Sequence, residues 1–118
     1  MKLSKILEIS GALNVLANTK LPAKASYRVA KAINLITSEL KVYDQARVKL
    51  AEELGTKSED GSRFDFADDA AKSFNDQIQA LLEEEVDITL PTVTPDELGA
   101  IEIEPLHLAI LDGVIIKE

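Results

Sequence analysis

Four cations in the N-terminal half have the type and spacing best suited to binding chemistry. Lys20, Lys24, Arg28 and Lys31 follow one another at intervals of four, four and three residues, and Tyr27 lies beside them. On a helix this spacing gathers the cations on one side, where they repel one another unless an anion lies near. That anion can be the chain's own acidic half, an acidic partner protein, or a small phosphorylated ligand whose base stacks on Tyr27. We therefore predict that these five residues bind an anionic ligand or an acidic partner.

Residues for catalysis or for metal binding are scarce. There is no cysteine, and the five glycines are scattered, so neither a thiol site nor a glycine-rich phosphate loop is indicated. The only histidine, His107, stands between two leucines, a position typical of a packed structural residue. The run Glu83-Glu84-Glu85 spreads around a predicted helix end and reads as a solvated acidic face. We expect no catalytic residue, no metal and no cofactor, and hence a protein that is not an enzyme.

The charge is divided along the chain. The net charge is −8, yet residues 1–50 hold nine Lys or Arg against three Asp or Glu, while residues 51–118 hold four against eighteen. The two parts therefore carry +6 and −14. Either the acidic half packs beside the basic half, in the same chain or a neighbouring one, or the asymmetry marks a binding surface. The acidic half repels a long polyanion, so we do not expect an extended nucleic acid as the ligand.

Two helices are predicted in the basic half. Residues 4–17 carry Ile6, Ile9, Leu13 and Leu16 at intervals of three and four, with Ser4 as the expected N-cap. Residues 22–54 begin with Pro22, contain no other proline and no glycine, and are followed by Gly55. They predict one long helix with a heptad-like apolar stripe. Short elements on one side cannot cover such a stripe, which favours a helical hairpin or a second subunit.

The acidic half predicts a turn at Asp60-Gly61, a short strand around Phe64 and a helix over residues 67–85. Residues 86–90 and 101–103 alternate apolar and polar side chains and are expected to pair as strands. Between them, Thr94, Pro95 and Glu97 form a helix start. Residues 105–116 read either as one helix or as a helix followed by a strand. The fold class is thus mainly α (α+β), a helical hairpin or long-helix core with a small antiparallel β element.

Length and hydropathy indicate the organisation of the chain. Its 118 residues fit a single domain, 1–118. The N-terminal stretch is interrupted by Glu8 and Asn14, so it predicts an amphipathic helix and not a signal peptide. No apolar run approaches the length of a membrane span. We expect a soluble, intracellular homo-oligomer with no membrane partner.

An ordered pattern along nearly the whole chain resembles a family of small uncharacterised proteins encoded by phages and prophages, mainly of Gram-positive hosts. The pattern consists of LPAKASYRVAK at 21–31, Glu39-Leu40-Lys41, Ala46-Arg47, Leu54-Gly55, an acidic glycine turn and VDITLP at 86–91. The family has no assigned activity, so it implies no functional residues. The resemblance implies phage origin and action in the cytoplasm of an infected bacterium.

Two classes of function fit these expectations. The first is an anti-defence role, in which the protein binds a host protein or sequesters a nucleotide signal. The second is an accessory role of an oligomeric protein in virion or tail assembly. The basic strip favours the first class, and the long heptad helix favours the second.

Overall fold

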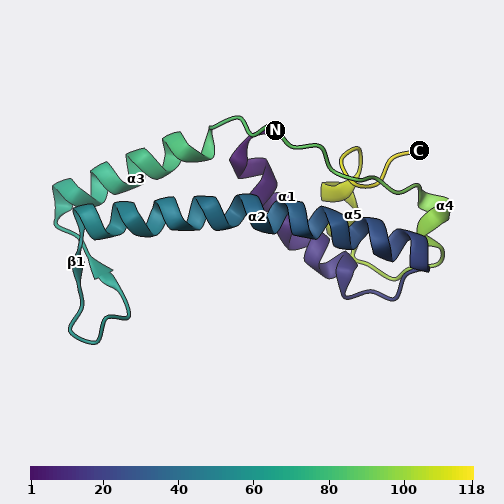
Figure 1. The fold of residues 1–118 in the computed structure, drawn as a ribbon, viewed down its shortest axis with the longest axis horizontal. Helices are drawn as coiled ribbons and strands as arrows, with labels where there is room; N and C mark the ends of the chain where they lie inside the picture. Colours follow the sequence, from purple (N-terminus) through teal and green to yellow (C-terminus); the bar gives the residue numbers. More distant parts are fainter.

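The computed structural model describes residues 1–118, and the fold is mainly helical with one small antiparallel sheet, as the sequence predicts. The long helix α2 (Ala23–Leu54) runs the length of a molecule that measures 52 × 30 × 23 Å. Helix α1 (Leu3–Ala17) crosses its N-terminal half, and α3 (Asp68–Leu82) returns along its C-terminal half (Figure 1). The short helices α4 (Pro95–Leu98) and α5 (Pro105–Leu111) lie at the α1 end.

The core is built where α1 crosses α2. Ile6, Ile9, Leu13 and Leu16 of the predicted stripe are fully buried, as are Ala25 and Ala32 of α2. Alanines in α2 let the backbones of the two helices approach closely, and the larger side chains of α1 fill the space between them. Val93, Leu98, Leu111 and Ile115 complete this cluster from the C-terminal segment. The periodicity of both helices is therefore confirmed.

Helix α1 begins earlier than expected. The prediction that Ser4 is the N-cap is wrong, because Lys2 occupies that position without a side-chain cap. The backbone N–H of Leu3 donates instead to the carbonyl of Glu84 at 3.0 Å. A contact from a distant part of the chain thus satisfies one of the N–H groups that a capping side chain usually serves.

The hairpin that joins α2 to α3 holds the sheet. Strands β1 (Thr56–Lys57) and β2 (Phe64–Asp65) pair antiparallel, with Thr56 opposite Asp65. At the tip, Asp60 accepts hydrogen bonds from Ser58 Oγ at 2.6 Å, from the backbone N–H of Ser62 at 3.1 Å and from Ser62 Oγ at 2.8 Å, and these bonds lower the pKa of Asp60 to about 2. Gly61 adopts a φ of +72°, which confirms the predicted turn. Gly55 ends α2 where a Cβ atom would lie 2.8 Å from Phe66 Cε1.

The expected pairing of residues 86–90 with 101–103 is wrong. Val86, Ile88 and Leu90 are half-buried against the helical core, while Asp87 and Thr89 are exposed. The alternation of apolar and polar residues therefore predicted correctly which side chains are half-buried, but these side chains pack against helices and not against a strand. Farther along, Val93 N–H donates to Ile115 O at 2.7 Å and Lys117 N–H donates to Val93 O at 2.9 Å. The last segment is thus a helix, Pro105–Leu111, followed by a turn at Gly113 (φ +77°) and a bridge to Val93.

Candidate functional site

The predicted basic strip is divided by the fold. Lys24, Tyr27, Arg28 and Lys31 lie on the first three turns of α2, but Lys20 lies before them in the connector between α1 and α2. The prediction that Lys20 shares the helical face is therefore wrong, because α2 begins only at Ala23. The reason is local: Pro22 is the residue before the helix and holds the extended conformation, with ψ 151°.

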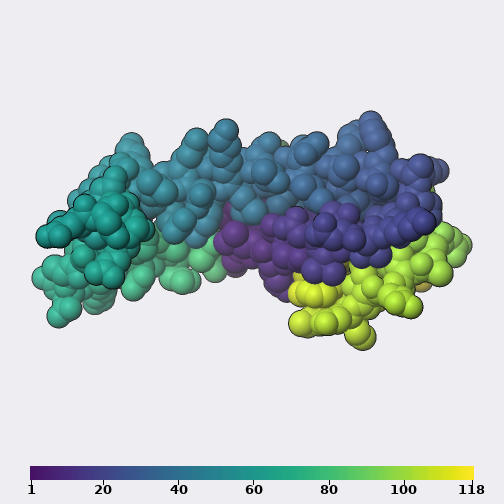
Figure 2. Space-filling view, turned by 90° about the horizontal axis from the view of Figure 1, so that it is seen from below, coloured from purple at the N-terminus to yellow at the C-terminus, as the bar shows by residue number.

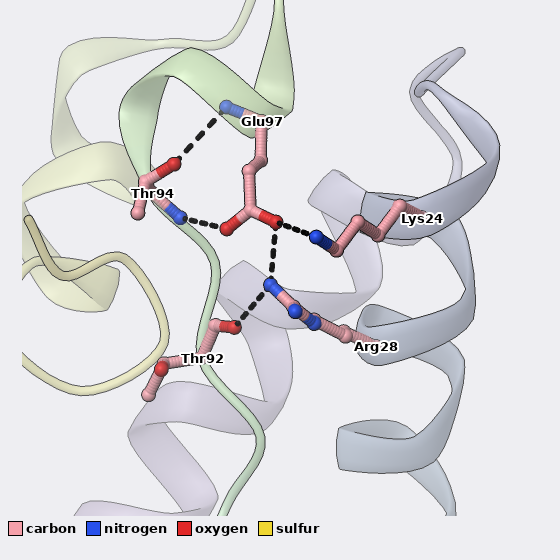
Figure 3. A network of polar contacts seen from close by, with 5 residues as sticks. All are labelled: Lys24, Arg28, Thr92, Thr94 and Glu97. Atoms are coloured by element: carbon pink, nitrogen blue, oxygen red, sulfur yellow. Dashed lines mark hydrogen bonds and ion pairs between the residues drawn. The ribbon is translucent and has the colours of Figure 1, made fainter.

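Lys24 and Arg28 turn toward a single carboxylate of the chain's acidic half. Arg28 Nη1 lies 2.5 Å from Glu97 Oε2, and Lys24 Nζ lies 3.5 Å from the same oxygen (Figure 3). Arg28 Nη1 also lies 3.5 Å from the carbonyl oxygen of Thr92. We call Lys24, Arg28, Thr94 and Glu97 the clasp. It joins α2 to α4 across 69 residues of sequence.

Glu97 is held in place by the start of α4. Thr94 N–H donates to Glu97 Oε1 at 3.0 Å, and Glu97 N–H donates to Thr94 Oγ1 at 3.2 Å, the reciprocal bonds of a capping box. The hydrogen bond from the Thr94 backbone, and then the charges of Arg28 and Lys24, lower the pKa of Glu97 from its ordinary value of 4.5. The sequence had indicated this helix start, and the structure confirms it.

The lowered pKa of Glu97 predicts how the clasp responds to acid. Because its carboxylate is favoured in the folded state, the stabilisation is complete above the ordinary pKa of 4.5 and disappears as the pH falls through the lower folded-state pKa. We expect Glu97→Gln to be less stable than the parent at neutral pH, and the difference to shrink steadily below pH 4.5. Urea unfolding of both proteins across this range measures it. A difference that stays constant down to the acid limit contradicts the role given to the Glu97 charge.

The clasp shows which anion lies beside two of the cations, a choice that the sequence left open. The anion beside Lys24 and Arg28 is the chain's own Glu97, so a free anionic ligand would have to compete with it. Sequence reasoning did not name Glu97 as a site residue. The capping box and the opposite charges of the two halves were the signals present, but many other carboxylates follow residue 50 and none is distinguished by spacing alone.

Tyr27 and Lys31 remain outside the clasp and face solvent. Lys31 Nζ lies 5.5 Å from the centre of the Tyr27 ring, a cation–π distance, and 66% of Tyr27 is exposed. Leu35 and Val42 continue the same side of α2 and are 41% and 63% exposed. We call Tyr27, Lys31, Leu35 and Val42 the outer face. The sequence prediction missed Leu35 and Val42, although their positions eight and fifteen residues after Tyr27 fit a second helical stripe.

An apolar pocket lies elsewhere, between α4 and α5. It has a volume of about 420 Å³ and is lined by Pro95, Leu98, Gly99, Ile101, Leu108, Ala109, Asp112 and Ile116. Asp112 is the only ionisable side chain in this lining, so the pocket offers no pair of groups for acid–base chemistry. His107 lies on α5 outside the lining, with Nδ1 buried without a hydrogen-bond partner and Nε2 4.0 Å from Glu104.

Residues 1–118 also contain no cluster of metal ligands and no buried polar residue. No three His, Asp or Glu side chains gather where they could hold a metal ion, and no polar or charged residue is buried. None of the helices has both the length and the apolar character that crossing a membrane requires. What the chain presents is a clasp that pairs its two charged halves and an exposed outer face on α2.

Comparisons with known proteins add no family to this picture. No protein-family model, curated protein or solved structure matches the chain.

Proposed function

We propose that this chain is a phage- or prophage-encoded accessory protein that works by binding and not by catalysis, and that it counteracts a host defence system by binding a host protein in the bacterial cytoplasm. The observation that carries the binding role is the outer face, where a tyrosine, a lysine and two aliphatic side chains stand exposed in one row. The phage origin is supported by the sequence resemblance alone. We further propose that the protein acts as a homo-oligomer.

The chemistry of the outer face favours a protein partner over a nucleotide. Exposed Tyr and aliphatic side chains in a row are typical of the centre of a protein interface, and Lys31 suits an acidic surface opposite them. A nucleotide needs a concave site with several free cations for its phosphates. Here two of the cations already contact Glu97, and none of Lys24, Tyr27, Arg28 and Lys31 lines the pocket between α4 and α5.

Plating of phages on defended bacteria tests the proposal. Expression of the chain is expected to restore plaque formation on at least one strain of a panel that carries different defence systems. Tyr27→Ala combined with Leu35→Ala should abolish this effect, because it removes the apolar centre of the outer face. Leu106→Ala is the matched control, since Leu106 is 65% exposed but lies on α5. Equal activity of all three proteins would contradict the outer face as the binding surface.

Two other outcomes would reassign the function. A rise in melting temperature with a cyclic or ADP-ribose-type nucleotide, abolished by Lys31→Glu, would show nucleotide sequestration by mass action. If phages that lack the gene fail to form plaques on undefended bacteria, the protein serves virion or tail assembly. The long unbroken α2, which is a common scaffold for oligomers, is the observation that favours this second candidate.

A further inference from the structure

One end of the molecule has almost no core. Between residues 37 and 92 only Ala51 is buried, and α3 has no buried residue at all. The other buried residues form one cluster at the α1 end. In Figures 1 and 2 the far end consists of α2, the hairpin and α3 alone, with neither α1 nor the C-terminal segment over it. Two helices by themselves cannot enclose an apolar core, so this arm has the architecture of half a helical bundle.

Three hollows follow one another along α2, from the start of α1 to the hairpin. The first, of about 460 Å³, is lined in part by Leu7, Leu40 and Tyr43. The second, of about 350 Å³, is lined by polar side chains around Val48, and the third, of about 370 Å³, contains Phe64 and other aromatic residues of the hairpin end. Neighbouring hollows share lining residues, and we call the three together the arm groove.

The middle of the arm groove has a self-complementary charge pattern. Its lining residues are Lys41, Asp44, Gln45, Val48, Lys49 and Glu52. Their spacing is symmetric about the point between Ala46 and Arg47, and the charges on the two sides of that point are opposite. If a second α2 lies antiparallel with this point aligned, Lys41 of each copy faces Glu52 of the other, and Asp44 faces Lys49. An isologous two-fold contact requires this reciprocity, whereas a contact with an unrelated protein does not.

We propose that a second copy of this chain docks antiparallel in the arm groove, with the two-fold axis crossing α2 between Ala46 and Arg47. This inference rests on the proposed homo-oligomer and names its interface.

Charge reversal at one predicted pair provides the experiment. The dimer contains two symmetric contacts between Asp44 of one copy and Lys49 of the other. Lys49→Glu turns both contacts into pairs of carboxylates, and Asp44→Lys turns both into pairs of lysines. Each variant alone is expected to dissociate at least about tenfold more readily than the parent protein. An equimolar mixture of the two variants restores an attractive pair at both contacts, so it should form a heterodimer of parent-like affinity. Sedimentation velocity and native mass spectrometry of the full chain measure these species.

Lys117→Glu is the matched control, because Lys117 is exposed, the charge change is the same as in Lys49→Glu, and the residue lies outside the arm groove. It should dimerise as the parent does. Circular dichroism verifies that all the variants keep their helices. A parent protein that is monomeric up to about 0.1 mM would overturn both the inference and the proposed homo-oligomer. An oligomer that neither variant weakens, or variants that do not recombine, would overturn only the interface named here.

Discussion

Leu13→Ala is expected to lower the free energy of unfolding by about 2–5 kcal/mol, the range found when a buried leucine is truncated and leaves a cavity. Leu13 is 1% exposed and lies in the core cluster where α1 crosses α2. A loss of this size is a large part of the roughly 5–15 kcal/mol that stabilises a typical domain. We expect a loss of this size because the core is confined to one end of the molecule, and no second buried cluster compensates for the lost packing.

Leu35→Ala provides the matched control, because it deletes the same atoms from a side chain that is 41% exposed. We expect its free energy of unfolding to stay within about 0.5 kcal/mol of the parent value, as for most surface substitutions. Urea unfolding followed by circular dichroism gives both values, and an unchanged dependence on urea shows that the unfolded states are comparable. Equal losses from the two substitutions would contradict the placement of the core.

Arg28→Glu is expected to lower the melting temperature by several degrees, whereas Lys31→Glu should leave it nearly unchanged. The two positions are one helical turn apart and both substitutions replace a cation by a carboxylate, so they differ mainly in their surroundings. Residue 28 faces Glu97 at 2.5 Å, and residue 31 faces only the ring of Tyr27 and solvent. The first substitution therefore places two carboxylates together and the second does not.

A charge-swapped double variant distinguishes the loss of the contact between Arg28 and Glu97 from a general effect of charge on α2. Glu97→Lys alone should also lower the melting temperature, because it adds a third cation beside Lys24 and Arg28 and removes the capping box. Combined with Arg28→Glu it restores opposite charges, so the double variant should be more stable than the two single losses together imply. Added salt should reduce the penalty of Arg28→Glu, since both partners are partly exposed to solvent. Strict additivity of the two substitutions would argue against direct contact between the side chains.

Local features of the sequence determined most of the helices. The intervals of three and four residues in Ile6, Ile9, Leu13 and Leu16 identified α1 and the side it buries, and the stretch from Pro22 to Gly55 identified α2. Thr94, Pro95 and Glu97 identified the start of α4. These signals work because helix periodicity and capping depend on residues within about one turn of each other.

The tertiary structure alone decided which distant residues meet. The sequence left the anion beside Lys24 and Arg28 open, and the fold brings Glu97 there by seating α4 against the first turns of α2. It also places residues 86–90 along helices where alternation had predicted a strand partner, and it satisfies the Leu3 N–H with Glu84 in place of a cap by Ser4. Such contacts depend on how whole elements stack, and neither charge nor periodicity distinguishes one of eighteen carboxylates from another before the helices are placed.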